Sequence, residues 1–160
     1  NLKSRGGFTL VELLIVMSLT LILVTATIPI YGSLQVQAQL NETSAQVVQT
    51  LRTARENSVA GYNSSAHGVY FDINVGGNDN YILYQGSSYS ARDTSYDRIN
   101  QLDGTLSFSN IDFNLISTKI DVNFSKGLGV PNNTGSLNLI HDIKGSVIIN
   151  VNSLGKVEED

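Results

Sequence analysis

The strongest pattern in the chain is an apolar run near its start, from Phe8 to Ile28. As a helix, its 21 residues span about 31 Å, close to the ~30 Å hydrocarbon thickness of a bilayer. The run therefore predicts a transmembrane helix. Lys3 and Arg5 precede it, so the positive-inside rule keeps the N-terminus cytoplasmic and places everything after Tyr31 outside. Glu12 is the one charged residue inside the run.

A second helical pattern with a narrower apolar face follows Gly32. Its apolar residues recur at spacings of three, four and seven, and they are Val36, Leu40, Val47, Val48, Leu51, Ala54 and Val59. We expect a half-exposed helix that lies against a sheet and ends near Gly61-Tyr62-Asn63, where glycine and asparagine adopt left-handed conformations. Pro29, between the two patterns, is expected to bend or loosen the helix or to mark the outer boundary of the membrane segment.

After the helix the apolar period changes to two, and Gly, Asn, Asp and Ser cluster between the runs. Antiparallel strands are predicted at His67–Val75, Asn80–Gln85, Gly104–Ser109, Lys119–Phe124, Gly135–Ile140, Gly145–Asn150 and Lys156–Glu158. The polar stretch Gly86–Asp97 is predicted to be an exposed loop between sheet halves. The chain therefore predicts an α+β fold, a long N-terminal helix packed on antiparallel β-sheet.

Composition limits the remaining options. The 160 residues leave room for one compact domain of about 120 to 130 residues beyond the apolar segment. Cysteine is absent, so the domain is held by its core without disulfides. The net charge is -4, and from Gly32 onward eight basic and thirteen acidic residues leave -5. Such a surface repels nucleic acid.

The residues around the start of the apolar run form a specific motif. Arg5-Gly6-Gly7 is followed directly by Phe8-Thr9-Leu10-Val11-Glu12-Leu13-Leu14-Ile15-Val16. This resembles the class III signal of the type IV pilin and type II secretion pseudopilin superfamily. The resemblance implies a type IV pilin-like fold, cleavage by a prepilin peptidase after Gly7, and methylation of the new amine on Phe8. A lone carboxylate in hydrocarbon needs a partner, and the resemblance implies that Glu12 pairs with the Phe8 amine of a neighbouring subunit.

This resemblance divides the chain into four parts. They are a leader at 1–7, a transmembrane and assembly helix at 8–31, the amphipathic half of the helix at 32–61 and a β-rich head at 62–160. The implied partners are the prepilin peptidase, other pilins or pseudopilins and an inner-membrane platform protein. The implied location is the cytoplasmic (inner) membrane, with one pass, followed by a periplasmic or extracellular filament. The alternative is a generic signal anchor whose Glu12 snorkels to the interface.

Segments of the head narrow the resemblance. The passage "LRTARENSVA", Leu51 to Ala60, followed by "HGVYFD", is similar to the helix-to-strand passage of the H-type (GspH/FimT-like) minor pseudopilins and minor pilins. The later "IDVNFSKGLGVPNNTGSLNL" and "GSVIINVNSLGKVEE" fit the same group. The resemblance implies a minor subunit, with a cysteine-free major pilin as the alternative.

The sequence contains no pattern of an enzyme or a cofactor site. His67 and His141 lack metal-ligand spacing and are expected to be ordinary strand-end residues. Asp72, Asn74, Asp79 and Asn80 offer oxygens for calcium, but position twelve counted from Asp72 is Leu83 rather than glutamate. A hairpin turn explains these four residues more simply.

Arg52 and Arg55 are the candidate contacts for DNA, as in a minor pilin of an uptake system. The acidic balance and the lack of a basic and aromatic patch oppose that hypothesis. We expect solvated helix-face charges instead, with Arg55 paired to nearby acids. The competing hypotheses are thus a filament subunit, a DNA-capturing minor pilin and a membrane-anchored binding domain unrelated to filaments.

Overall fold

The computed structural model describes residues 7–74, 76–110, 112–113 and 119–160, apart from the side chains of residues 26–30 and 110. Its one long helix, α1, runs from Leu10 to Ala60 over 51 residues. The chain divides into two compact units, Asn1–Gln35 and Val36–Asp160. The first part of the helix belongs to the former unit and its second part to the latter.

Local signals in the sequence set both ends of α1. At the start, the Thr9 hydroxyl oxygen accepts a hydrogen bond from the Glu12 amide at 3.2 Å, as an N-cap does. At the other end, Gly61 adopts φ 63°, a left-handed conformation that glycine takes without steric cost. A short 3₁₀ helix, η1 (Tyr62–Ser64), follows directly. The predicted helix end near Gly61 is confirmed.

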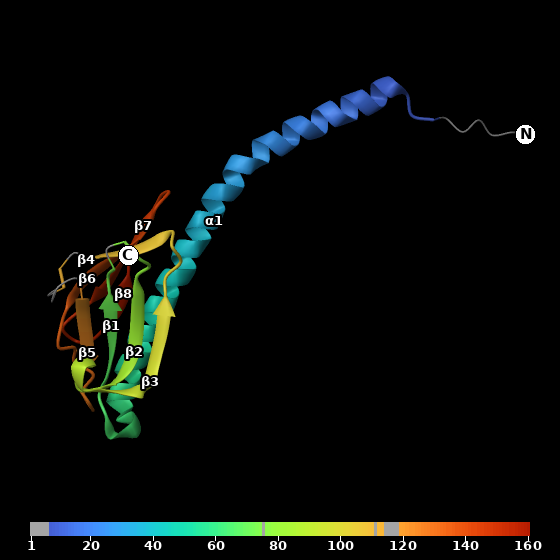
Figure 1. The fold of residues 1–160 in the computed structure, drawn as a ribbon. Helices are drawn as coiled ribbons and strands as arrows, with labels where there is room; N and C mark the ends of the chain where they lie inside the picture. Colours follow the sequence, from blue (N-terminus) through green and yellow to red (C-terminus); the bar gives the residue numbers. More distant parts are fainter. Residues whose placement is uncertain (1–6, 75, 111, 114–118) are drawn as a thin grey trace, which may run out of the picture. The chain divides into compact units, whose positions relative to one another are not determined.

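The second unit contains two antiparallel sheets (Figure 1). The first sheet has the strand order β3-β2-β1-β5, with β1 (His67–Asp72), β2 (Asn80–Gly86), β3 (Arg92–Gln101) and β5 (Lys119–Phe124). The second has the order β4-β6-β7-β8, with β4 (Leu106–Asn110), β6 (Gly135–His141), β7 (Ser146–Val151) and β8 (Val157–Glu159). The predicted α+β class, a long helix with antiparallel sheets, is confirmed.

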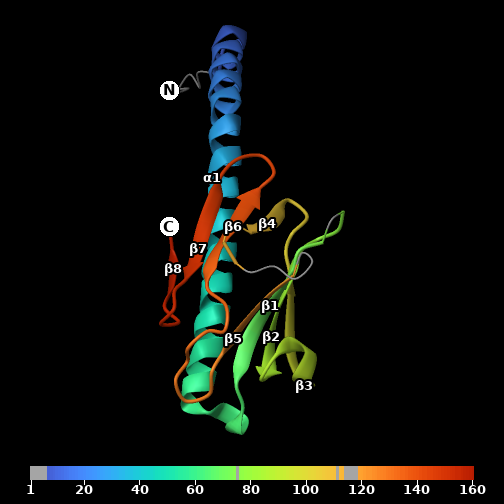
Figure 2. The same cartoon turned by 90° about the vertical axis from the view of Figure 1, so that its left-hand side faces the viewer.

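The strands of both sheets lie beside the second part of α1 (Figure 2), and one core of buried side chains joins the three. The helix contributes Leu40, Val47, Val48, Leu51 and Ala54, all buried, with Val36 packed at the edge. These are the predicted apolar positions, with one exception. Val59, in the last turn, is 44 % exposed. It borders Gly129 in the loop after β5 rather than a strand, so the apolar face ends one turn earlier than the sequence predicts.

The prediction of a loop at Gly86–Asp97 is wrong. This stretch holds a 3₁₀ turn, η2 (Tyr89–Ala91), and the first half of β3, which pairs with β2 in an antiparallel ladder. The strand lies at the edge of its sheet, and none of its residues is buried. Without a buried face it carries no apolar alternation, and alternation is the signal by which a strand is found in a sequence.

Buried polar side chains link the elements of the head. Asp79, only 3 % exposed, accepts hydrogen bonds from the Asn74 amide at 2.7 Å and from the Phe108 amide at 2.6 Å. Because Asn74 follows β1 and Phe108 lies in β4, this carboxylate connects the β1–β2 hairpin to the second sheet. The loop at Asp79 is therefore a joint between sheets as well as the expected hairpin turn.

Candidate processing and assembly site

The predicted cleavage point lies in an open stretch of chain ahead of α1. Gly7 and Phe8 precede the helix start at Leu10, and the Phe8 side chain is 81 % exposed. A Cβ atom built on Gly7 meets nothing within 4 Å. Nothing in the described structure requires glycine at position 7, and cleavage after Gly7 stays a prediction.

Glu12 occupies the third position of α1. The Thr9-x-x-Glu12 spacing is that of a capping box, and the structure contains the bond from the Glu12 amide to the Thr9 hydroxyl oxygen. A carboxylate here also benefits from the positive end of the helix dipole. The side chain is exposed, and no ion pair of Glu12 occurs within the described residues. Its charge thus faces outward from a helix start.

The first part of α1 presents an apolar surface around its circumference. The large apolar side chains from Leu10 to Val24 are each more than half exposed. The hydroxyl groups between them are turned back to the helix: Ser18 donates to the Leu14 carbonyl at 2.7 Å, and Thr20 donates to the Val16 carbonyl at 3.0 Å. An exposed apolar surface of this extent marks a contact with lipid or protein.

The transmembrane prediction for residues 8–28 includes residues 26–28, whose side chains lie outside the described part of the chain. Among the residues that are described, no helix has the length and hydropathy of a membrane span. Pro29 falls within the bounds of α1, but its side chain is also outside the description. The bend expected there stays a prediction.

Comparison with protein families places a known motif on this segment. Residues 2–28 match the family model of the prokaryotic N-terminal methylation motif. This is the motif of type IV pilins and pseudopilins, and it supports processing by a prepilin peptidase. No match was found among curated proteins or among solved structures. The match covers the N-terminal segment alone, and it leaves the narrower resemblance to H-type minor subunits as a prediction.

Arg52 and Arg55 hold the C-terminal segment against α1. Arg52 donates to the Val157 carbonyl at 3.0 Å, and Arg55 donates to the Leu154 carbonyl at 3.4 Å. Together with Lys156 they line a hollow of about 210 Å³. The expected pairing of Arg55 with acids is wrong for the described residues, because Arg55 donates to a main-chain carbonyl there and its buried Nε has no partner. A loop that closes on the helix offers main-chain carbonyl groups, which accept hydrogen bonds from a guanidinium although they carry no charge.

The two histidines lie in different sheets, His67 at the start of β1 and His141 at the end of β6, and both are buried. Burial lowers the pKa of His67, with the Gln85 side chain opposing the shift. His141 Nε2 lies 3.3 Å from the Gln39 oxygen of α1. Within the described residues, no cluster of three His, Cys, Asp or Glu side chains is placed to hold a metal ion.

Two features of the head could not be predicted from the sequence. One is the joint at Asp79, because the Gly- and Asn-rich sequence around it predicts only a turn. The other is a hollow beside Tyr70 and Asp121, two residues that face each other across the β1–β5 ladder. Strand register places that pair together, and a single sequence contains no signal of register between strands about fifty positions apart.

Proposed function

We propose that this chain is a structural subunit of a type IV pilus or a type II secretion pseudopilus. The observation that carries the proposal is the methylation motif over residues 2–28, which includes a helical segment with an exposed apolar surface. A prepilin peptidase cleaves after Gly7, and the amine of Phe8 is then methylated. The mature subunit is retained in the cytoplasmic membrane by its apolar segment and leaves it for the filament.

Packing between helices drives assembly in this proposal. Moving an apolar helix from lipid into a filament replaces lipid contacts with contacts between helices. Glu12 gives this process direction, because a buried carboxylate is costly until it pairs with a cation. The Phe8 amine of the adjacent subunit is that cation. The partners are the peptidase, other pilins or pseudopilins and an inner-membrane platform protein.

The head points to a minor, H-like subunit, which decorates the fibre or caps its tip. The support is the similarity of the helix-to-strand passage and of the final strand to that group, together with the absence of cysteine. Arg52 and Arg55, the candidate DNA contacts, both bind main-chain carbonyls of the C-terminal segment. Their role in docking that segment gives no support to a DNA-binding minor pilin.

The test is expression of the full chain with a prepilin peptidase, followed by intact mass, N-terminal sequencing and recovery of sheared filaments. We expect mature protein to begin at methylated Phe8 and Gly7→Val to remain uncut. Glu12→Gln is the informative variant, because an amide keeps the reach of a capping-box side chain but removes the charge. We expect Glu12→Gln to be cut normally and to be lost from the sheared fraction.

Glu42→Gln is the matched control, since Glu42 is an exposed glutamate on the same helix beyond the apolar segment. It should be cut and assembled like the wild type. Normal assembly of Glu12→Gln would limit Glu12 to a capping role and contradict the charge pair. A wild-type chain that is never cut before Phe8 would leave a membrane-anchored domain unrelated to filaments.

A further inference from the structure

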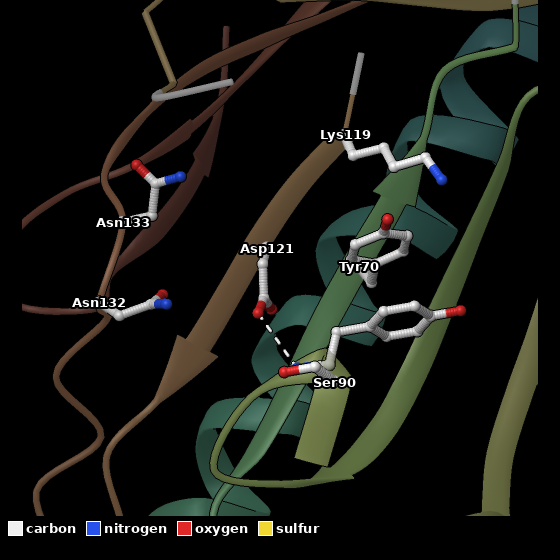
Figure 3. Close-up of a pocket in the computed structure, with 7 residues that line it drawn as sticks. Tyr70, Ser90, Lys119, Asp121, Asn132 and Asn133 are labelled. Carbon is white, nitrogen blue, oxygen red and sulfur yellow. Dashed lines mark hydrogen bonds between the residues drawn. The ribbon is translucent and has the colours of Figure 1, made fainter. Parts of the chain in front are cut away.

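A hollow of about 400 Å³ opens on the first sheet of the head, at the size of sites for small ligands (Figure 3). One side is formed by Tyr70 of β1 and by Tyr89 and Ser90 of η2. Asn132 and Asn133, in the loop after β5, form the opposite side, with Lys119 and Asp121 of β5 between the two. Four separate segments of the chain thus converge on one hollow.

The aromatic side of the hollow is rigid. The rings of Tyr70 and Tyr89 are stacked, with centroids 3.6 Å apart and planes 5° from parallel. The Arg92 guanidinium carbon lies 3.7 Å from the centroid of the Tyr89 ring. Arg92 is itself held by Asp97 through a bond of 2.8 Å. Stacking and a cation–π contact therefore hold this wall in place before any ligand arrives.

Asp121 is fixed by hydrogen bonds on both of its oxygens. The Tyr84 hydroxyl donates to one oxygen at 2.5 Å, and the Tyr89 amide donates to the other at 3.2 Å, the bond dashed in Figure 3. A carboxylate accepts about four hydrogen bonds in all, so acceptor capacity remains on the side of the hollow. Lys119 lies two residues earlier on β5, hence on the same face of the strand. Its ammonium group lies beside the Tyr70 hydroxyl (Figure 3) and supplies donors at that end of the hollow.

The facing loop adds an oriented amide. The Asn132 side-chain oxygen accepts from the Asn123 amide at 2.7 Å, and this bond determines which end of the Asn132 amide is left over. Its NH₂ group carries two donor hydrogens and makes no hydrogen bond among the described residues. The hollow thus combines fixed donors, a fixed acceptor and an aromatic wall.

We propose that this hollow binds a neutral carbohydrate. Its two charged lining residues, Lys119 and Asp121, cancel, so neither an anion nor a cation finds a net opposite charge there. Adjacent sugar hydroxyl groups each donate and accept, which matches a site that offers an acceptor at Asp121 and donors at Lys119 and Asn132. The carbon-bound hydrogens of a sugar ring pack against an aromatic side chain, and here that side chain is Tyr70, because Tyr70 and Arg92 already cover the two faces of the Tyr89 ring.

The experiment uses the full chain in detergent micelles and the methyl glycosides of galactose, glucose, mannose and N-acetylglucosamine as probes. Saturation-transfer NMR detects contact, and calorimetric titration measures the dissociation constant. We expect at least one glycoside to bind with a dissociation constant of about 1 mM or lower, the range of a few net hydrogen bonds. Inorganic phosphate and a short neutral peptide are tested alongside.

Two variants are tested, so that the result does not depend on a single substitution. Lys119→Ala removes an exposed donor, and Ser90→Trp fills the hollow from an exposed position on η2, so each is expected to weaken binding roughly fivefold or more. Lys144→Ala, an exposed lysine away from the hollow, is the matched control and should leave binding unchanged. Absence of binding for every glycoside overturns the proposal. So does preferential binding of phosphate or peptide, or glycoside binding that both Lys119→Ala and Ser90→Trp leave intact.

Discussion

Replacing Asp79 with asparagine tests whether a single carboxylate joins the two sheets of the head. The aspartate accepts one backbone N–H from Asn74 and one from Phe108, at 2.7 and 2.6 Å. Asparagine has almost the same shape but only one acceptor atom, and its NH₂ group must then face one of these two N–H donors. The substitution therefore changes hydrogen bonding with almost no change in volume.

The magnitude follows from these two bonds. A hydrogen bond to a charged group contributes about 1.5–3 kcal/mol, and a buried donor left without a partner costs about 1–3 kcal/mol. Asp79→Asn loses one such bond and strands one amide, and the Phe108 amide is buried. We expect the free energy of unfolding of the head to fall by about 3–5 kcal/mol. For a domain of this size, that corresponds to a decrease of about 10–20 °C in midpoint temperature.

The assay is urea unfolding of the full chain in a mild detergent, followed by circular dichroism in the strand region. Asp142→Asn is the control, because it makes the same change of charge at an exposed position in the second sheet's β6–β7 turn. We expect a lower urea midpoint for Asp79→Asn at an unchanged slope, and a wild-type midpoint for the control. A loss under about 1 kcal/mol for Asp79→Asn would refute the reasoning, because the two bonds would then be replaceable by water.

Two further predictions concern pH and the C-terminal segment. Burial lowers the pKa of His67 below its ordinary 6.5, so the unfolded chain binds more protons than the folded chain, and stability should fall as the pH decreases below about 6.5. Between pH 7 and pH 5 the urea midpoint should therefore fall less steeply in His67→Gln than in the wild type. Equal slopes in the two proteins would contradict this prediction. Gly155→Ala places a Cβ against the Gly129 carbonyl at φ +75°, so trypsin should cut after Lys156 faster than in the wild type. Gly127→Ala is the control, because Gly127 has a similar φ but a Cβ atom there meets nothing within 4 Å. If Gly127→Ala raised the rate of trypsin cleavage as much as Gly155→Ala, the effect would come from backbone conformation alone.

Burial separates the elements of this fold that were predictable from those that were not. Elements with a buried face were predictable, since α1 from Leu40 to Ala54 and strands such as β6 and β7 alternate between core and solvent. β3 was missed because neither of its faces is buried. Apolar periodicity in a sequence indicates burial, so a strand without buried residues leaves no periodic signal.

Of the two candidate sites, one was predictable from the sequence and the other was not. The methylation motif is a contiguous run of residues, so it could be found in the sequence and matched to a family over residues 2–28. The hollow beside Asp121 depends on the register that sets Tyr70 opposite Asp121, and on a loop that returns to the same face. Such a site exists only in the folded chain, because its residues come from four segments that the sequence separates.

The contact between α1 and the end of the chain has a consequence for synthesis. Arg52 and Val157 are 105 positions apart, and Ser44 and Glu159 are 115 apart. At about 5–20 residues per second, a ribosome needs about 5–20 s to pass from the helix to the segment that covers it. The methylation motif emerges before either partner. An elongating chain therefore offers its N-terminal signal while the helix face above β8 is still bare, so recognition of the signal does not have to wait for a finished head.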